Sequence, residues 1–273
     1  MCYAFSVATL IDQYRFSHGD KDFQHITSPL LLTLKTIENF HDLGSTFSGG
    51  KVEHAFFTAQ HFGSCSAKII SDHLGPYGID FLLKNLQVFQ QKFIQHKESR
   101  TLISEKIYQF LKNSGVDAQA LPSTSEIEKN ILLGPDVFIS KTLLKFCTEN
   151  KKLPRLPDLK LLFQPQVTQE QLLNRIQTLL SMQTPLGINF CSNVVTDSTY
   201  AGGLQGEHWF CKDFLNHSAL LVGREMRNGK CQFLIQDTGC KGYEKNNFFC
   251  QQGQYWLGAD QLLKNTHGIF WLD

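Results

Sequence analysis

The sequence predicts an α+β fold in which a helical half comes before a half built from short strands. Apolar residues recur at helical spacing through most of the chain before Pro185, and after Pro185 they fall into short runs of strand length. Asn228-Gly229 separates two of these runs, and this dipeptide favours the tight type I′ turn of a β-hairpin. Because the helices precede the strands instead of alternating with them, the order favours α+β over alternating α/β.

The first helix is expected at residues 2–16. Its apolar positions follow a period close to that of an α-helix: Ala4, Val7, Ala8, Ile11 and Tyr14. Gly19 is placed to end it. Residues 28–47 have a mixed pattern that predicts no definite element.

A second helix is expected after the break at Ser48-Gly49-Gly50. Its apolar positions are again at helical spacing: Val52, Ala55, Phe56, Ala59 and Phe62. Gly63 is a suitable C-terminal stop.

Residues 79–149 have the pattern of several amphipathic helices. One apolar face carries Leu82, Leu86, Phe89 and Phe93, and another carries Ile103, Ile107 and Leu111. A basic linker with Pro154, Pro157 and Pro165 follows, and it is not expected to be helical.

One more helix is expected to begin at Thr168. Thr168 and Gln171 form a capping box, and Val167 and Leu172 can form a hydrophobic staple. Pro185 closes the helical half. Strands are then expected at residues 186–191, 217–224, 231–237, 254–257 and 268–272.

Composition excludes some classes of function. The chain has 26 basic and 25 acidic residues, so its net charge of +1 argues against a nucleic-acid partner, which usually requires a basic face. It contains no apolar run of about 18 residues, so no membrane span is expected. The N-terminus has no features of a signal peptide.

The eight cysteines do not have metal-site spacing. None forms a C-x-x-C pair, so we expect no metal and no other cofactor. Five cysteines lie near the C-terminus, where disulfides are one interpretation and ordinary buried thiols the other; Cys240 and Cys250 bracket one loop.

Cys2 and His217 carry the main chemical signal. A thiolate is a much better nucleophile than a thiol, and both a helix N-terminus and a neighbouring imidazolium lower the pKa of a cysteine. Cys2 begins the first expected helix, and His217 begins a strand. Pairing around Asn228-Gly229 puts His217 opposite position 240, so a bulge or a longer loop would bring Asp237 beside His217 to orient its ring.

Short segments resemble papain-like cysteine peptidases, and they occur in the family's order. Cys2-Tyr3-Ala4-Phe5-Ser6 is similar to Cys-Trp-Ala-Phe-Ser, and residues 216–223 are similar to Asn-His-Ala-Val-Leu-Val-Val-Gly. Residues 233–239 fall where the family has Trp-Ile-Ile-Lys-Asn-Ser-Trp-Gly. The Ser48-Gly49-Gly50 break with its following helix is similar to the family's Gly-Gly substrate loop, and residues 185–191 resemble the strand that opens its β lobe.

The resemblance implies a two-lobed fold with a helical lobe and a small antiparallel β barrel lobe. The expected division is 1–78 for the helical lobe with the nucleophile helix, 79–166 for a helical insertion and linker, and 167–273 for the β lobe. The insertion is expected because Cys2 and His217 are roughly 215 residues apart, against about 130–150 in such enzymes. Its role is open; it could cap a cleft or bind a partner.

The resemblance also implies a thiol protease that hydrolyses peptide or protein substrates. Cys2 would be the nucleophile, His217 the acid and base, and Asp237 the orienting group in place of an asparagine; Gly49, Gly50 and Asn216 would contact substrate. Gly239 replaces a tryptophan of the family. Because only Met1 stands where the family places an oxyanion-hole glutamine, we expect a divergent member that is truncated at its N-terminus, from a secreted or periplasmic protein.

Two alternatives belong to other classes of function. The first is a pseudo-peptidase, which has the same fold without turnover and binds peptides or proteins. The second is an N-terminal-nucleophile amidase in which removal of Met1 leaves the α-amine of Cys2 as its own base. Such amidases usually have strands after the cysteine, whereas a helical pattern follows Cys2.

Overall fold

The structure is a computed structural model that describes residues 2–20, 26–46, 49–63, 65, 78–147, 156–197, 199–205, 208–211, 216–237 and 253–273. The expected features at Met1, Ser48, Pro154, Gly239, Cys240 and Cys250 lie outside these residues. The chain forms two compact units. The helical unit comprises Asp22–Pro154 with Met1, and the sheet unit comprises Cys2–Lys21 with Arg155–Asp273. The three-part division expected from the resemblance stays a prediction.

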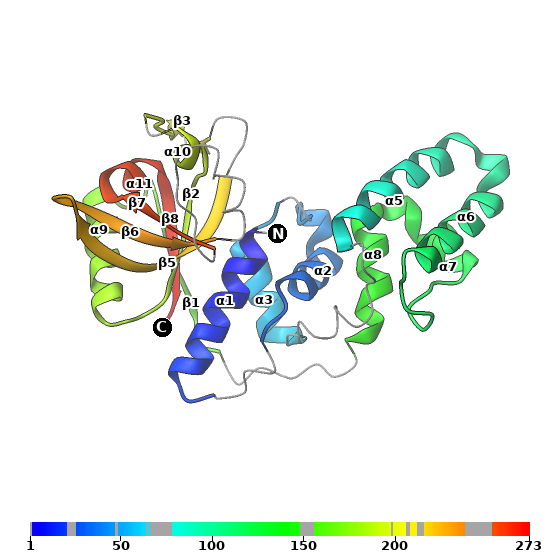
Figure 1. Cartoon of the computed structure of the whole chain (residues 1–273), viewed down its shortest axis with the longest axis horizontal. Helices are drawn as coiled ribbons and strands as arrows, with labels where there is room; N and C mark the ends of the chain where they lie inside the picture. The colour runs from blue at the N-terminus through cyan, green and yellow to red at the C-terminus, as the bar shows by residue number, and fades with distance from the viewer. Residues whose placement is uncertain are drawn as a thin grey trace. The chain divides into compact units, whose positions relative to one another are not determined.

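The helical unit contains the helices expected in this part of the chain, together with others that were not predicted (Figure 1). They are α2 (Pro29–Phe40), η1 (His41–Leu43), α3 (Val52–Phe62), α5 (Gly78–Gln95), η2 (Lys97–Ser99), α6 (Arg100–Asn113), α7 (Thr124–Asn130), η3 (Ile131–Leu133), α8 (Pro135–Leu143) and η4 (Leu144–Phe146). The sequence pattern did not predict α2, which begins with local signals: Pro29 is at its first position, and the side chain of Ser28 accepts a hydrogen bond from the Leu31 N–H. None of the helices in the described residues has the length and apolarity of a membrane span.

One apolar cluster holds the helical unit together. The predicted faces of α5 and α6 both contribute to it, through Leu82, Leu86 and Phe93 on α5 and Ile103, Ile107 and Leu111 on α6. A disulfide joins Cys65 and Cys147, whose Cα atoms are 5.9 Å apart. This bond links the segment after α3 to the residue that follows η4, and the sequence did not predict this pairing.

The sheet unit combines helix α1 with all of the described strands (Figure 1). Its elements are α1 (Cys2–Ser17), β1 (Leu159–Phe163), α9 (Gln169–Ser181), β2 (Leu186–Cys191), α10 (Asn193–Thr196), β3 (Gly203–Gln205), β4 (His208–Phe210), β5 (Asn216–Arg227), β6 (Lys230–Gln236), β7 (Gln254–Gly258), α11 (Ala259–Asn265) and β8 (Thr266–Leu272). Six strands form an antiparallel sheet in the order β1-β8-β2-β5-β6-β7, and β3 pairs with β4 separately.

The α+β class predicted from the sequence is confirmed, and so are all five predicted strands to within a few residues. The sheet is open and not a closed barrel, because β1 and β7 are edge strands among the described residues. The linker prediction missed β1, which pairs with β8 between Pro157 and Pro165. An edge strand tolerates flanking prolines because one side of its backbone needs no partner. Helix α11 was not predicted either.

Both faces of the sheet are covered. One face packs in a cluster with α9 and α11 through residues such as Ile188, Leu221 and Phe233. The alternate residues Leu220 and Phe270 are also fully buried, and α1 contacts β5, β2 and β8. The central strand β2 is buried at every position, as expected for a strand covered on both faces, whereas β7 alternates between half-buried and buried residues.

Gly187 on β2 is required by the packing of the sheet. A Cβ atom at this position would lie 1.9 Å from the ring of Phe270, which is fully buried on the paired strand β8. We expect Gly187→Ala to reduce the free energy of unfolding by about 1–3 kcal/mol, because the ring has no space to move into. The measurement is urea denaturation of the full chain.

The matched control is Gly223→Ala on β5. A Cβ there meets nothing closer than 3.5 Å. The change in the free energy of unfolding should therefore be much smaller for Gly223→Ala than for Gly187→Ala. Equal destabilisation by the two substitutions would contradict the packing argument.

Candidate active site

Cys2 is the first residue of helix α1, which is buried along most of its length. Tyr3, Ala4, Val7 and Ile11 are at most 1% exposed, as expected for a helix that is surrounded by protein. The thiol is reduced and half-buried, and it forms a hydrogen bond with the His217 side chain. The thiol of Cys2 therefore lies at the helix end where unpaired N–H groups favour negative charge.

The other end of α1 is fixed by a buried ion cluster. Arg15 is 2% exposed, and its guanidinium contacts Asp12 at 3.1 Å and Asp20 at 2.7 Å. The two carboxylates compensate the buried positive charge, which would otherwise be costly. Together with the apolar packing, this cluster holds the helix that carries Cys2.

His217 is the second residue of β5, and it bridges the thiol and a carboxylate. Its Nε2 lies 2.8 Å from Oδ2 of Asp237, so Nδ1 is the nitrogen available to Cys2. The ring of Phe190, on the paired strand β2, meets the imidazole edge to face at 5.5 Å between centroids. The imidazole is thus held on two sides by side chains of the sheet unit.

A β-bulge brings Asp237 to His217. The hairpin turn at Asn228-Gly229 has positive φ at both residues, as the predicted type I′ turn requires. Strict pairing from this turn would put Asp237 opposite Leu220, so His217 would point to the other face. The register shifts by one between Leu221 and Gly223, which puts Leu220 opposite Gln236. If this pairing is extended by one residue, Asp237 lies opposite Ala219. Ala219 is two residues from His217, so Asp237 and His217 are on the same face of the sheet.

The thiol of Cys2 is easier to ionise than an ordinary cysteine. Burial raises its pKa, but the hydrogen bond from His217, the charge of His217 and the backbone N–H of Ser218 lower it, and the result is a pKa of about 7. A substantial fraction of Cys2 is therefore thiolate at neutral pH.

The imidazole of His217 is easier to protonate than an ordinary histidine. Burial lowers its pKa, but the hydrogen bonds and charges of Asp237 and Cys2 raise it to about 9. Between about pH 7 and pH 9, the stable form of the pair is thus a thiolate beside an imidazolium.

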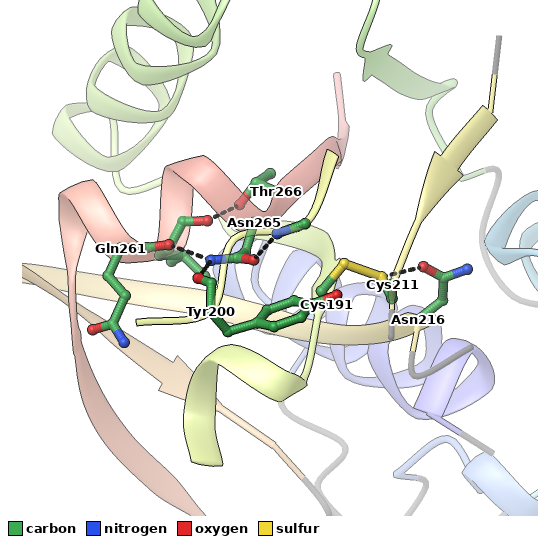
Figure 2. Close-up of a disulfide and its surroundings, with 9 residues drawn as sticks. Cys191, Tyr200, Cys211, Asn216, Gln261, Asn265 and Thr266 are labelled. Carbon is green, nitrogen blue, oxygen red and sulfur yellow. Dashed lines mark hydrogen bonds between the residues drawn. A yellow bond between two sulfur atoms is a disulfide. The ribbon is translucent and has the colours of Figure 1, made fainter. Parts of the chain in front are cut away.

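Further polar contacts surround the pair. The hydroxyl of Ser218 donates to Oδ1 of Asn189 at 2.6 Å, and Asn189 faces Ser218 across β2 and β5. A disulfide joins Cys191, at the end of β2, to Cys211, and the side-chain oxygen of Asn216 lies 2.8 Å from the Cys211 sulfur (Figure 2). The disulfide therefore ties the end of β2, which is paired with β5, to a residue that precedes β5 in the chain.

Asn265, the last residue of α11, fixes the backbone at Tyr200 and Gly202. Its side chain accepts a hydrogen bond from the Gly202 N–H and donates to the carbonyls of Tyr200 and Gln261 (Figure 2). Asn265 is fully buried, and these bonds satisfy its amide group.

The structure thus brings Cys2, His217 and Asp237 together in the sheet unit, and it places Asn216 beside His217. Gly49 and Gly50 belong to the helical unit, where Gly49 forms hydrogen bonds with Thr46. A role for Gly49, Gly50 and Asn216 in substrate binding stays a prediction. Among the described residues, no group of three or more His, Cys, Asp or Glu side chains could hold a metal ion.

Comparison with known proteins identifies the fold through structure and not through sequence. No protein-family model matches the chain, and no curated protein matches it. Among solved structures, the chain is similar to xylellain, a cysteine protease from Xylella fastidiosa, with a TM-score of 0.52 and 14% identity over 100% of this chain and 78% of xylellain. The chain has the papain-like fold.

Digestive procathepsin L2 and procathepsin L 3 from the larval midgut of Tenebrio molitor are also similar. Their TM-scores are 0.48 and 0.46, their identities 14% and 13%, and each comparison covers 99% of this chain and 60% and 62% of the respective proteinase. The similarity to xylellain confirms the papain-like fold predicted from the short ordered segments, and at 14% identity it shows the fold alone.

Two groups that contact Cys2 and Asp237 were not predicted from the sequence. The backbone N–H of Ser218 bonds to the Cys2 sulfur, and the hydroxyl of Tyr255, on β7, donates to Oδ2 of Asp237 at 3.2 Å. Ser218 follows His217 directly, so its proximity could have been inferred from the pair. Tyr255 could not, because residues 238–252 separate β6 from β7 and the sequence gives no register for this pairing.

Proposed function

We propose that the chain is a papain-like cysteine peptidase that hydrolyses peptide bonds of peptide or protein substrates through a thiol acyl-enzyme. The observation that carries the proposal is the thiolate–imidazolium pair of Cys2 and His217 with Asp237 on the far side of the ring. A cysteine peptidase needs a thiol that is ionised at neutral pH and an acid that can protonate the leaving amine, and this pair supplies both.

In the first half of the reaction, the Cys2 sulfur attacks the carbonyl carbon of the scissile peptide bond. The C–N bond then breaks, and the proton on Nδ1 of His217 is transferred to the departing amine. The products are a free amine and a thioester on Cys2. The backbone N–H of Cys2 has no acceptor within the helix, because it belongs to the first residue. It can therefore donate a hydrogen bond to the developing oxyanion.

In the second half, neutral His217 takes a proton from water, and the hydroxide attacks the thioester carbon. The C–S bond breaks and releases a carboxylic acid, which restores the thiolate and the imidazolium. Asp237 keeps the proton on Nε2 throughout, because its Oδ2 accepts a hydrogen bond from that nitrogen at 2.8 Å. Nδ1 is thereby reserved for the exchange of protons with substrate.

The Cys2–His217 pair also favours the peptidase over the two alternative functions. A pseudo-peptidase that only binds has no need of an ionised thiol, so the lowered pKa of Cys2 favours turnover. An N-terminal-nucleophile amidase uses the α-amine as base and usually has strands after the cysteine, whereas here α1 follows Cys2 and His217 is the neighbouring base. Binding of a partner by the helical unit is an additional proposal that the peptidase does not require.

The proposal is tested with a peptidyl epoxide, which alkylates activated cysteines, and with fluorogenic peptides. We expect labelling at Cys2, identified by mass spectrometry, together with hydrolysis; both should be absent in Cys2→Ala. Cys231→Ala is the matched control, because Cys231 is the other reduced, half-buried cysteine among the described residues, and it should retain both. Labelling without hydrolysis of any peptide in a diverse library would favour the pseudo-peptidase, and absence of labelling would contradict the proposal.

A further inference from the structure

Tyr255 contacts the far end of the Cys2–His217–Asp237 chain. Its hydroxyl donates a hydrogen bond to Oδ2 of Asp237 at 3.2 Å. The same oxygen accepts the bond from Nε2 of His217 at 2.8 Å. One carboxylate oxygen therefore receives two donors from two different strands, β5 and β7.

This carboxylate is in a setting where its hydrogen bonds have large effects. The side chain of Asp237 is 1% exposed, and Tyr255 is also 1% exposed. A buried carboxylate stays charged only when donors replace the water that it has lost, and hydrogen bonds to charged groups are stronger than neutral ones. The hydroxyl of Tyr255 is thus one of the groups that stabilise Asp237 as an anion.

The ring of Tyr255 gives the hydroxyl a fixed direction. It belongs to the apolar cluster of the sheet unit, and Tyr255 is paired with Ile235 between β6 and β7. The backbone N–H of Asp237 donates to the carbonyl of Gly253, the residue before β7, at 2.8 Å. Gly253 and Tyr255 therefore hold Asp237 by its backbone and by its carboxylate.

We infer that Tyr255 is a positioning residue: it fixes the Asp237 carboxylate so that Oδ2 faces Nε2 of His217, and thereby helps to hold the imidazolium beside Cys2. Tyr255 contacts no reacting atom and acts through Asp237. The inference rests on the proposed function, but it concerns the state of the thiol, which can be measured without any substrate.

The test is Tyr255→Phe in the full chain, which keeps the ring in the core and removes the hydroxyl. Without the hydroxyl, the Asp237 carboxylate is less well oriented towards Nε2 and stabilises the protonated form of His217 less. The imidazolium in turn stabilises the Cys2 thiolate less. We expect the apparent pKa of Cys2 to rise above about 7, and alkylation of Cys2 by iodoacetamide at pH 6.5 to slow by about threefold to tenfold. Alkylation is followed on the Cys2 peptide by mass spectrometry, in a Cys231→Ser background.

A double-mutant cycle separates positioning from packing. In an Asp237→Ala background, Tyr255→Phe should have no further effect on the alkylation rate, because the carboxylate through which Tyr255 acts is gone. Tyr255→Leu is the second variant, since it also removes the ring; if its folded fraction shows the same alkylation profile as Tyr255→Phe, the hydroxyl is responsible. Tyr108→Phe, at a half-buried tyrosine of the helical unit, should leave the profile unchanged.

An unchanged or lowered apparent pKa of Cys2 in Tyr255→Phe would overturn the inference, as would an equal effect of that substitution in the Asp237→Ala background. A chain that hydrolyses no peptide but shows the expected alkylation changes would refute the peptidase proposal and leave the role of Tyr255 intact. If hydrolysis is present, kcat/KM at pH 6.5 should fall by a factor similar to the alkylation rate.

Discussion

Replacing His217 with alanine is expected to lower kcat/KM for peptide hydrolysis by about 10⁴-fold or more. The substitution removes the acid that protonates the leaving amine, and it also removes the main group that keeps Cys2 ionised. Burial, which raises the pKa of Cys2, would then be opposed mainly by the backbone N–H of Ser218. The thiol should therefore be protonated at neutral pH, and its pKa should exceed the ordinary value for cysteine.

Two measurements check this result. Hydrolysis of a fluorogenic peptide gives the loss in kcat/KM, and the pH dependence of iodoacetamide alkylation gives the pKa of Cys2. His96→Ala is the matched control, because His96 is an exposed histidine of the helical unit, between α5 and η2. If His217→Ala left alkylation of Cys2 at pH 7 as fast as in the parent, the two side chains would not form the proposed pair.

Replacing Asp237 with alanine is expected to narrow the pH range of activity by lowering its alkaline limit. In the parent, activity requires Cys2 without its proton, which favours pH above about 7, and His217 with its proton, which favours pH below about 9. Loss of Asp237 removes the hydrogen bond and the charge that raise the pKa of His217, while the burial that lowers it remains. The alkaline limb should move towards neutral pH, and maximal kcat/KM should fall by about 10²–10⁴-fold.

Asp237→Asn separates the two contributions of the carboxylate. The amide can still accept a hydrogen bond from Nε2, but it carries no charge, so its alkaline limb should lie between those of the parent and Asp237→Ala. Asp158→Ala is the control for loss of an acidic residue, since this side chain is 82% exposed. A pH profile of Asp237→Ala with both limbs in the parental positions would show that Asp237 does not act on His217.

The sequence was most informative where the structural signal is local. The helix stop at Gly63 has positive φ, the capping box at Thr168 is formed, and the turn at Asn228-Gly229 joins β5 to β6. Each of these depends on a few neighbouring residues whose backbone preferences are intrinsic. The same holds for the segments around Cys2 and His217, whose residues and order predicted the papain-like fold.

The sequence was least informative where a partner from elsewhere in the chain decides the outcome. Strand β1 lies in a segment whose prolines argue against a strand. It forms because the backbone of β8 is available to pair with it. The pairing of Cys65 with Cys147 spans a sequence separation of 82 residues, and no local pattern predicts it.

By itself, the sequence predicted Cys2, His217 and Asp237 as candidate catalytic residues and determined the local elements that hold them, because helix stops, caps and turns follow from nearby side chains. The tertiary structure decided whether these residues meet. A one-residue bulge between Leu221 and Gly223 turns Asp237 to the face of His217, because neighbouring positions along a strand point to opposite faces. The same sheet pairing brings Tyr255 to Asp237 and places α1, with Cys2, against β5.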